Sequence, residues 1–469
     1  MSATTSTDDG RKRKASSLEE EEEVSCPYLD TIQRSLLDFD FEPACSVSLE
    51  SGPHIYGCLV CGKFFRGRGP QTPAYTHSVQ DGHFVFVHLA NSKFYCLPDN
   101  YLIQDSSLQD IAAALHPTFT KDEIAKIDTK TELARDLFGR RYLPGFVGLN
   151  NLNKTDCINA CVQALAHVPP LRDFFLQHKE QQAVTELSTK STDSQVVSAH
   201  RMSRLVTQCF GELVRKLWSD QRFKNQIDPH MLTQAIAAAS KNKFKIGQQM
   251  EAGEFMAWFL HQLHIGLGGS SRKPGSSIIH AIFQGKVQVT TRQLKTVQDS
   301  AGNEQTDNRL GSDDEDEEMK DKEEKQQQQQ QQVLEETTAD SHFLQLTLDI
   351  SQKPLFRDAD GGLVIPQEPL VTVLKKFDGV SFSDILNKDK AQRRRYRIQQ
   401  LPPYLILHLA RFQTNQYTSE KNPTIVAFPV RNLDLSDYVF TKDEKKKEKQ
   451  KLPTEEQVRA MSVREALQS

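Results

Sequence analysis

The sequence has little apolar material and no long hydrophobic run. Hydrophobic residues make up 37% of its 469 positions, against about 45–50% in a typical compact domain. No stretch reaches the roughly 18 apolar residues of a membrane-spanning helix. The first residues, MSATTSTDDGRKRK, lack the apolar core of a signal peptide. We therefore expect neither a membrane protein nor a secreted one, and we expect part of the chain to be disordered.

An excess of one charge is also missing, and so are cysteines and histidines in the later part of the chain. The 58 basic and 62 acidic residues nearly balance, which argues against a broad nucleic-acid-binding surface. No cysteine follows Cys209 and no histidine follows His408. In a chain that is not secreted, the 8 cysteines are expected to be metal ligands, core residues or nucleophiles rather than a disulfide framework.

Changes in composition divide the chain. We predict a disordered charged tail at 1–24, a first domain at 25–120, a helical linker at 121–142, a second domain at 143–440 and a lysine-rich tail at 441–469. Residues 296–340, with an acidic run and seven consecutive glutamines, are predicted to be a disordered insertion in the second domain. In that domain helical patterns precede strand patterns, which predicts an α+β fold.

The first domain contains a metal-ligand pattern. Cys58 and Cys61 are separated by two residues, and His77 and His83 follow, giving C-x2-C-x15-H-x5-H. A C-x2-C turn supplies two thiolates from one loop, and two imidazoles complete the tetrahedron that Zn²⁺ prefers. We predict one zinc ion on these four residues. Cys45 and Cys96 are expected to be packed core thiols, with a role as ligands the weaker alternative.

The residues around these ligands, CLVCGKFFRGRG, AYTHSVQDGHFVFVHL and KFYCLPDNY, resemble the UBP-type zinc finger of deubiquitinases and related proteins. In members that bind ubiquitin, an aromatic-lined pocket and an arginine shortly after the Cys-Gly pair hold the free C-terminal Gly-Gly. Here Lys63 stands at that position. An ammonium cannot form the planar bidentate contact of a guanidinium with a carboxylate, so the resemblance also allows a protein-docking module.

The second domain resembles the ubiquitin-specific proteases, which have a papain-like fold with a helical thumb and a β palm. Residues 148–159, GLNNLNKTDCIN, match the family's Cys box, G-L-x-N-L-G-N-T-C-Y-M-N. Three further segments follow in the family's order: QMEAGEF at 249–255, FQG at 283–285, and LPPYLILHLARF at 401–412 followed by FP. Four motifs in register favour membership of this family.

The same alignment places Asp156 at the position of the nucleophilic cysteine. A carboxylate cannot form a thioester, although it suits the positive end of a helix and can cap it. Cys157 is one residue along, which rotates its side chain by about 100° around the helix. The family's catalytic histidine lies beyond the F-P strand, where this sequence has none. We therefore expect a pseudoenzyme, with a palm truncated at its C-terminus.

A UBP-type finger before a degenerate protease domain resembles the catalytically inactive, ubiquitin-specific-protease-like proteins of the spliceosome. The resemblance implies a nuclear, non-catalytic scaffold in pre-mRNA splicing that helps to assemble or stabilise the tri-snRNP. Its partners would be spliceosomal proteins, with ubiquitin or a ubiquitin-like protein as a further candidate. Sequence-specific nucleic acid binding and membrane binding are not implied. The alternative is a ubiquitin-binding protein or a cysteine-type deubiquitinase.

Overall fold

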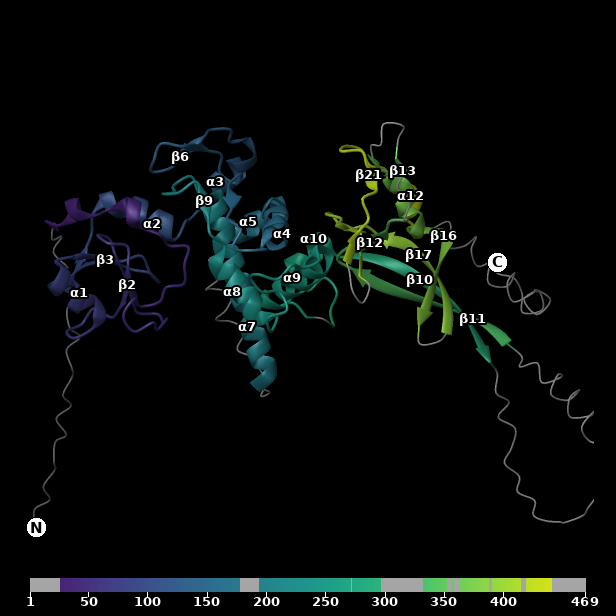
Figure 1. Cartoon of the computed structure of the whole chain (residues 1–469), viewed down its shortest axis with the longest axis horizontal. Helices are drawn as coiled ribbons and strands as arrows, with labels where there is room; N and C mark the ends of the chain where they lie inside the picture. The colour runs from purple at the N-terminus through teal and green to yellow at the C-terminus, as the bar shows by residue number, and fades with distance from the viewer. Residues whose placement is uncertain are drawn as a thin grey trace, which may run out of the picture. The chain divides into compact units, whose positions relative to one another are not determined.

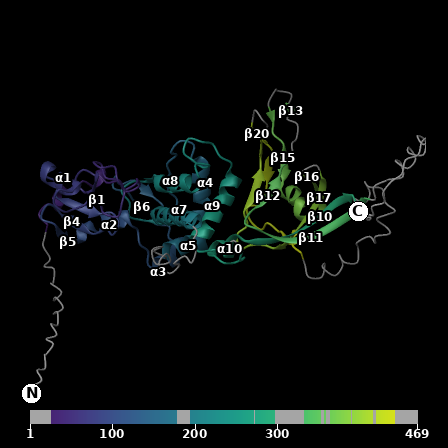
Figure 2. The same ribbon diagram turned by 90° about the horizontal axis from the view of Figure 1, so that it is seen from below.

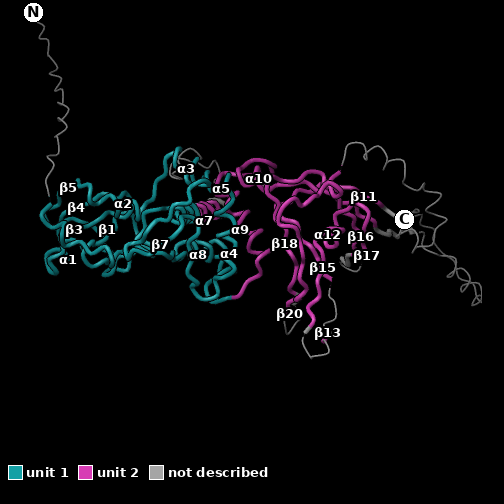
Figure 3. Tube along the Cα trace, turned by 90° about the horizontal axis from the view of Figure 1, so that it is seen from above, with its two compact units in different colours: residues 1–180, 208–248 teal, residues 181–207, 249–469 magenta. Residues whose placement is uncertain are grey.

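The computed structural model describes residues 26–177, 194–270, 272–296, 332–351, 356–357, 363–387, 390–414 and 419–440. The chain divides into two compact units, coloured separately in Figure 3: unit 1 is Met1–Glu180 with Gln208–Gln248, and unit 2 is Gln181–Thr207 with Gln249–Ser469. The tails predicted at 1–24 and 441–469 lie outside the described residues, as does 297–331 of the predicted insertion.

A five-stranded antiparallel sheet organises the first part of unit 1 (Figure 1), with the strand order β2-β1-β3-β4-β5. Its elements are β1 (Ile55–Cys58), β2 (Phe64–Arg66), α1 (Pro73–Asp81), β3 (Val85–His88), β4 (Phe94–Cys96) and β5 (Tyr101–Ile103). Successive side chains of a strand point to opposite faces. In β3, Val85 and Val87 therefore join one buried cluster and Phe86 joins another. The sheet is packed on both faces.

Helices make up most of the rest of unit 1. They are α2 (Gln109–Leu115), α3 (Lys121–Lys126), α4 (Asp156–Ala166), α5 (Pro169–Gln177) and α8 (His230–Ala239), with α7 (Ser194–Trp218) contributing its C-terminal half. The strands β8 (Gly148–Leu149) and β9 (Gln226–Ile227) form a short parallel pair. In the chain, β8 precedes α4 and β9 precedes α8. The pair fixes where α4 begins.

The prediction of a helical linker at 121–142 is wrong beyond the first turns of that segment. Helix α3 ends at Lys126 and a 3₁₀ turn, Ile127–Thr129, follows. The chain then forms an antiparallel hairpin from β6 (Ala134–Arg135) and β7 (Arg141–Tyr142). Asp136 and Gly139 lie in the turn, with Gly139 at φ +78°, and these residue types favour turns over helices. Local turn chemistry thus outweighs the helical propensity of the surrounding charged residues.

A largely buried ion pair connects the segment before the sheet to helix α7. The Nζ of Lys216 lies 2.8 Å from Oδ1 of Asp40, and the two side chains are only 19% and 15% exposed. Asp40 also accepts a hydrogen bond from the backbone N–H of Asp228. Burial alone would raise the pKa of Asp40, but the charge of Lys216 and these hydrogen bonds hold that pKa below its usual value. Asp38 and Lys224 form a second ion pair beside it.

Unit 2 contains helices α9 (Ala252–Gly266) and α10 (Ile278–Phe283) and then mostly strands, as the α+β prediction requires. Its large antiparallel sheet has the order β11-β10-β17-β16, whose strands lie side by side in Figures 1 and 2. The bounds are β10 Gly285–Thr296, β11 Gln332–Phe343, β16 Asp378–Asn387 and β17 Lys390–Gln400.

Smaller strand pairs and one short helix complete the described part of unit 2. The pairs are β12 (Leu346–Asp349) with β18 (Leu407–Ala410), β13 (Phe356–Arg357) with β14 (Leu363–Val364), β15 (Gln367–Pro369) with β21 (Ile425–Ala427), and β19 (Phe412–Thr414) with β20 (Ser419–Lys421); the helix is α12 (Leu370–Leu374). Val287, Leu348 and Ile398 lie in its core, so one cluster joins the large sheet to the β12–β18 pair.

The predicted insertion at 296–340 is too long at its C-terminal side. Residues 332–340 belong to β11, which pairs with β10 in an unbroken register from Gly285↔Phe343 to Thr296↔Gln332. Backbone pairing along a neighbouring strand stabilises even polar residues in extended form, which composition alone does not reveal. The two strand ends that flank residues 297–331 therefore lie directly opposite each other.

Ion pairs run across the large sheet. Arg292 on β10, whose side chain is 4% exposed, pairs with Glu336 on β11 at 2.7 Å. Its guanidinium also lies 4.7 Å from the ring centroid of Phe382 on β16. On β17, Arg393 pairs with Asp384 of β16 at 2.6 Å. Each of these two ion pairs offsets the charge of one arginine in a polar sheet.

Among the helices of the described residues, none combines the length and the apolar character needed to cross a bilayer.

The facing strand ends predict that residues 297–331 are dispensable for folding. Because Thr296 and Gln332 are a cross-strand pair, replacing 297–331 with Asn-Gly should close a two-residue hairpin. We expect thermal unfolding of the variant within about 2 °C of the wild type. Arg292→Ala is the control for damage to the sheet, because it removes the nearer cation of Glu336 and leaves only Arg395, at 4.0 Å; it should lower Tm by roughly 5 °C or more. A comparable loss in the Asn-Gly variant would contradict the prediction.

Candidate functional site

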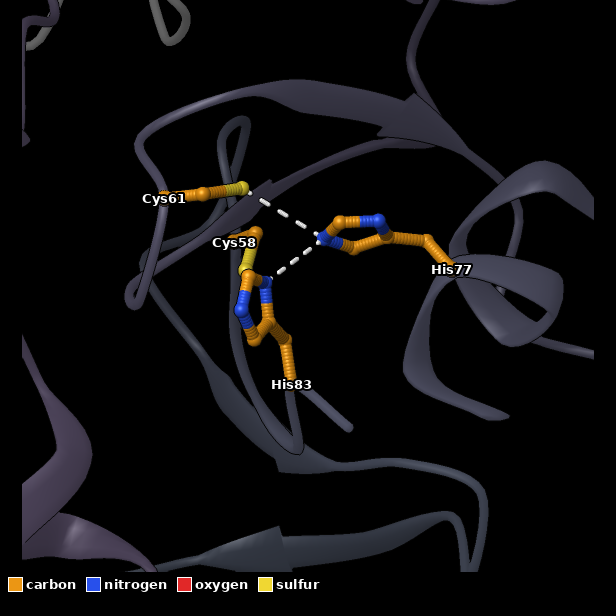
Figure 4. Close-up of side chains that lie close together, drawn as sticks. All are labelled: Cys58, Cys61, His77 and His83. Carbon is orange, nitrogen blue, oxygen red and sulfur yellow. Dashed lines mark hydrogen bonds between the residues drawn. The ribbon is translucent and has the colours of Figure 1, made fainter. Parts of the chain in front are cut away.

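Four side chains of unit 1 converge on one point (Figure 4). The ligand atoms of Cys58, Cys61, His77 and His83 all lie within 4.8 Å of one another. Cys58 Sγ is 3.6 Å from His83 Nδ1, Cys61 Sγ is 3.4 Å from His77 Nε2, and the two imidazole nitrogens are 3.1 Å apart. A tetrahedral Zn²⁺ with ordinary bond lengths separates its donor atoms by roughly 3.3–3.8 Å. The geometry fits a metal ion of this size.

The local fold explains why these residues meet. Cys58 ends β1, and the turn after it is closed by hydrogen bonds between Cys58 and both Lys63 and Gly62. His77 lies on α1, which ends at Gly82 in the left-handed conformation, at φ +68°. That reversal returns the chain so that His83 faces His77 at the start of the path into β3. The glycine thus sets the spacing of the two histidines.

The two thiols form a hydrogen-bonded pair. A hydrogen bond between Cys58 and Cys61 raises the pKa of Cys58 and lowers the pKa of Cys61 to about 4. One thiolate is therefore favoured at neutral pH by the protein alone. Thiolate, rather than thiol, is the form that ligates a metal.

His77 is oriented by contacts outside the cluster. Its Nδ1 lies 2.5 Å from Oδ2 of Asp81, one helical turn further along α1. The ring of Phe65 stacks on its imidazole with centroids 4.1 Å apart. The carboxylate fixes the tautomer in which Nε2 carries a lone pair toward the cluster. Sequence reasoning missed Asp81, although its i+4 spacing from a predicted ligand was visible.

The remaining cysteines of this region are core residues. Cys26, Cys45 and Cys96 are at most 4% exposed and belong to the cluster that contains Val85 and Val87. None of them is in the metal-ligand group, which is the one such group among the described residues. The prediction of packed core thiols for Cys45 and Cys96 is confirmed.

A separate cavity of about 600 Å³ opens beside β1 and β2. Arg66, Arg68 and Tyr56 line it, and the guanidinium of Arg68 lies 4.2 Å from the ring centroid of Tyr95. Burial raises the pKa of Tyr56, so its phenol stays neutral. Lys63, the residue singled out from the sequence for a ubiquitin tail, is exposed and does not line this cavity.

The start of α4 has the local structure that the Cys-box motif implies. Asn151 Oδ1 accepts hydrogen bonds from the N–H and the hydroxyl of Thr155. Asn159 donates to the carbonyl of Asn150, and Gln163 donates to that of Val147 at 2.7 Å. The motif's polar residues therefore hold the strand–turn–helix in place.

Asp156 is the first residue of α4, and Thr155 is its N-cap. The expectation that Asp156 caps the helix is wrong, but a carboxylate in the first turn still interacts favourably with the helix dipole. Cys157 is buried, with 9% of its surface exposed. The first position of α4 therefore carries a carboxylate, and the thiol that follows it is buried.

In unit 2, His408 of β18 is committed to a structural contact. Its Nε2 lies 2.7 Å from Oε1 of Glu251, which also accepts hydrogen bonds from the N–H groups of Gly253 and Glu254 at the start of α9. A Cβ on Gly253 would lie 2.5 Å from the imidazole. The motifs QMEAGEF and LPPYLILHLARF therefore serve to attach α9 to β18.

Comparisons with known proteins agree with this architecture. The family model of ubiquitin carboxyl-terminal hydrolases matches residues 147–452, and that of the zinc finger in ubiquitin hydrolases and other proteins matches residues 45–108. Human "Ubiquitin carboxyl-terminal hydrolase 39" is 43% identical over 414 residues, covering 88% of this chain and 67% of that protein. The chain belongs to the ubiquitin carboxyl-terminal hydrolase family and carries a UBP-type finger before the hydrolase domain.

Two fungal relatives and one solved structure are also similar. The "Probable mRNA-splicing protein ubp10" of Schizosaccharomyces pombe is 38% identical, over 88% of this chain and 73% of that protein. The "Pre-mRNA-splicing factor SAD1" of Saccharomyces cerevisiae is 25% identical, over 90% and 80%. The crystal structure of an essential yeast splicing factor has TM-score 0.59 and 23% identity, covering 86% of this chain and 82% of that one. It shows the shared fold.

The contact between His77 and Asp81 predicts a measurable effect on metal affinity. Asp81→Asn should weaken binding of Zn²⁺ to the apoprotein by about 10–100-fold, because it removes the charge that orients the imidazole. Competition with a chromogenic chelator measures this affinity. Asp122→Asn, at an exposed acid on α3, is the matched control and should bind as the wild type does. Equal affinities of all three proteins would contradict the prediction.

Proposed function

We propose that this protein is a non-catalytic member of its family, acting as a nuclear scaffold in pre-mRNA splicing. The observation that carries the proposal is Asp156 at the first position of α4, within a motif whose Asn151, Thr155 and Asn159 are present and hydrogen-bonded. A carboxylate there cannot supply the thiolate nucleophile of a cysteine protease. The fold is kept while the chemistry is lost.

The splicing role is supported by the relatives. Two fungal proteins that share 38% and 25% of the aligned residues carry splicing in their names, and each aligns over most of this chain. We propose that the partners are spliceosomal proteins and that the protein helps to assemble or stabilise the tri-snRNP. The four basic residues Arg11–Lys14 are of the kind that direct nuclear import.

We propose Zn²⁺ as the metal of the finger. Two thiolates and two imidazoles at tetrahedral separations are the donor set of structural zinc. Cys58, Cys61, His77 and His83 would hold the ion, whose chemistry is structural: it links β1, α1 and the path into β3. Metal binding of this kind contributes directly to folding.

The absence of catalysis is tested by hydrolysis of a ubiquitin C-terminal fluorogenic amide. We expect no turnover above the uncatalysed rate, and no difference between wild type and Asp156→Asn, because neither side chain forms a thioester. The Cys157→Ser variant serves as the control for a stand-in nucleophile. Turnover that is lost in Cys157→Ser or after thiol alkylation would contradict the proposal.

The splicing role is tested separately, by depleting the protein from cells of its own organism. We expect the tri-snRNP peak of a glycerol gradient to fall and to recover with the wild type and with Asp156→Asn alike. An unchanged tri-snRNP after depletion would contradict the scaffold role.

A second candidate function, capture of a protein C-terminus, is favoured by the cavity beside β1 and β2. An arginine held against an aromatic ring, with a neutral tyrosine beside it, can bind a terminal carboxylate. Arg68 would then do what the sequence comparison assigned to Lys63. Gly69 lines the same cavity, and nothing lies within 4 Å of where its Cβ would be, which leaves room for a narrow peptide tail.

A labelled peptide that ends in Gly-Gly tests this second function. We expect the free-acid peptide to bind at least about tenfold more tightly than its C-terminal amide, because only the acid can pair with the guanidinium. Arg68→Ala should abolish the difference, and Lys63→Ala, the control at an exposed cation, should retain it. Equal binding of acid and amide would contradict the prediction.

A further inference from the structure

The segment between the two family matches has a defined structure and forms part of the surface of unit 1. Residues 109–146 lie outside both family models, yet they form α3 and the β6–β7 hairpin and contribute to a cavity. We propose that this surface docks an acidic peptide segment of a partner protein, which inserts one bulky apolar side chain into the cavity. The proposal goes beyond the scaffold role, because it assigns the docking to a site that shares no residue with the metal cluster or with α4.

The cavity at the foot of the hairpin has a volume of about 550 Å³. Its apolar lining includes Pro117, Phe119, Ile127, Pro144 and Trp218. A cavity of this size and lining accommodates an aromatic side chain together with adjoining backbone. Burying such a side chain stabilises a complex by roughly 1.5–3 kcal/mol. The cavity therefore accounts for the apolar anchor of the peptide.

The hairpin beside the cavity is basic. Arg135, Arg140 and Arg141 are exposed, whereas the hairpin's one acid, Asp136, is 6% exposed. The carboxylate of Asp136 points into the turn, where it accepts hydrogen bonds from the N–H groups of Phe138 and Arg140 at 3.0 and 2.8 Å. The charge that the hairpin presents to solvent is thus positive, which complements an acidic peptide.

Acidic residues at the cavity are mostly engaged already. Glu123 closes the capping box of α3 with Thr120, and Asp220 pairs with Lys130 at 2.9 Å. Glu132 is the third acid in the lining, which also contains Lys126 and Lys130. With three acids and two lysines the lining is slightly acidic, so the attraction for an acidic peptide comes from the hairpin arginines alone.

The surface is held in place before any partner binds. The hydroxyl of Tyr142, at the end of β7, donates to the carbonyl of Ser219 in the cavity wall, and the N–H of Gly145 donates to the carbonyl of Leu217 at 2.8 Å. A Cβ on Gly145 would lie 2.5 Å from the ring of Trp218, so the backbone passes directly over the indole. A preformed site loses little conformational entropy on binding.

Apolar side chains stand among the arginines. Leu133, Leu137 and Phe138 are 54%, 41% and 61% exposed, and a cluster of exposed apolar residues within a charged surface is typical of protein-binding sites. The guanidinium of Arg140 lies 5.7 Å from the ring centroid of Phe138, so that face of the ring is taken by the protein itself. The apolar lining of the adjoining cavity favours a peptide, which can insert an apolar side chain, over a nucleic acid, which carries none.

Fluorescence anisotropy with defined peptides tests the proposal on the full chain. The test peptide carries one tryptophan between runs of glutamate and aspartate; one matched peptide has lysines in place of the acids, and another has alanine in place of tryptophan. We expect the wild type to bind the acidic tryptophan peptide at least about tenfold more tightly than either matched peptide. Addition of salt should weaken this binding, because the arginines are exposed.

Three variants locate the site. The double variant Arg140→Glu, Arg141→Glu reverses the hairpin charge, and Thr131→Trp places a large side chain at the cavity; each should weaken binding about tenfold or more. Lys273→Glu, at an exposed cation of unit 2, is the control and should bind as the wild type does. Thermal unfolding and zinc content establish that each variant is folded, and they are independent of this surface.

Two results would overturn the proposal. One is equal binding of the acidic and lysine peptides, or binding that the charge reversal leaves unchanged. The other is tighter binding of a labelled oligouridylate that competes with the peptide, which would make the hairpin a nucleic-acid contact. Neither result bears on catalysis or on the tri-snRNP, so the scaffold proposal can fail or survive separately.

Discussion

The largely buried ion pair between Asp40 and Lys216 constrains how unit 1 is assembled, because it holds the segment before the sheet against helix α7. Each charge there has lost most of its hydration, so each needs the other. Removing one partner of such a pair typically costs roughly 3–5 kcal/mol. Because Asp40 precedes the sheet and Lys216 lies near the end of α7, the pair binds the finger to the helices that follow it. The finger and these helices belong to one compact unit.

The hydrolase motifs have become structural elements. Asn151, Asn159 and Gln163 hold the turn before α4 by hydrogen bonds to backbone, and Glu251 and His408 attach α9 to β18. Removal of any of these would leave a polar group unsatisfied inside the fold. Asp156, which we propose stands at the nucleophile position, makes no comparable structural demand, since a carboxylate at a helix start is favourable by ~0.3–1 kcal/mol. If the protein is non-catalytic, as we propose, selection for the fold alone would retain the hydrogen-bonded residues of the motif without requiring a thiol at position 156.

Much of the fold and of the candidate site could be predicted from local patterns. The order of helices and strands, the core positions of Cys45 and Cys96, and the four residues that converge at the finger all follow from spacing and residue type. Features that depend on a distant partner could not be predicted. Residues 332–340 are polar and become a strand only because β10 lies beside them.

Two other features were hidden for the same reason. Asp136 and Gly139 form a turn within a run that otherwise favours helix. Arg68 becomes a candidate binding residue because the sheet brings Tyr95 beneath it. In each case one or two residues determine the local structure against the propensity of their neighbours. An average of composition over several residues does not show such an effect.

Because the register between β10 and β11 is unbroken up to Thr296 and Gln332, the connection between these two residues is a position at which the chain can be lengthened. Thr296 and Gln332 are already a cross-strand pair, so the pairing of β10 with β11 does not require any particular structure in the connecting segment. The entropy of closing a loop grows slowly, by about 0.6 kcal/mol for each doubling of its length. Relatives can therefore differ widely in length here while keeping one fold, and a fluorescent protein or an affinity domain inserted between Thr296 and Gln332 would report on the complete molecule without disturbing it.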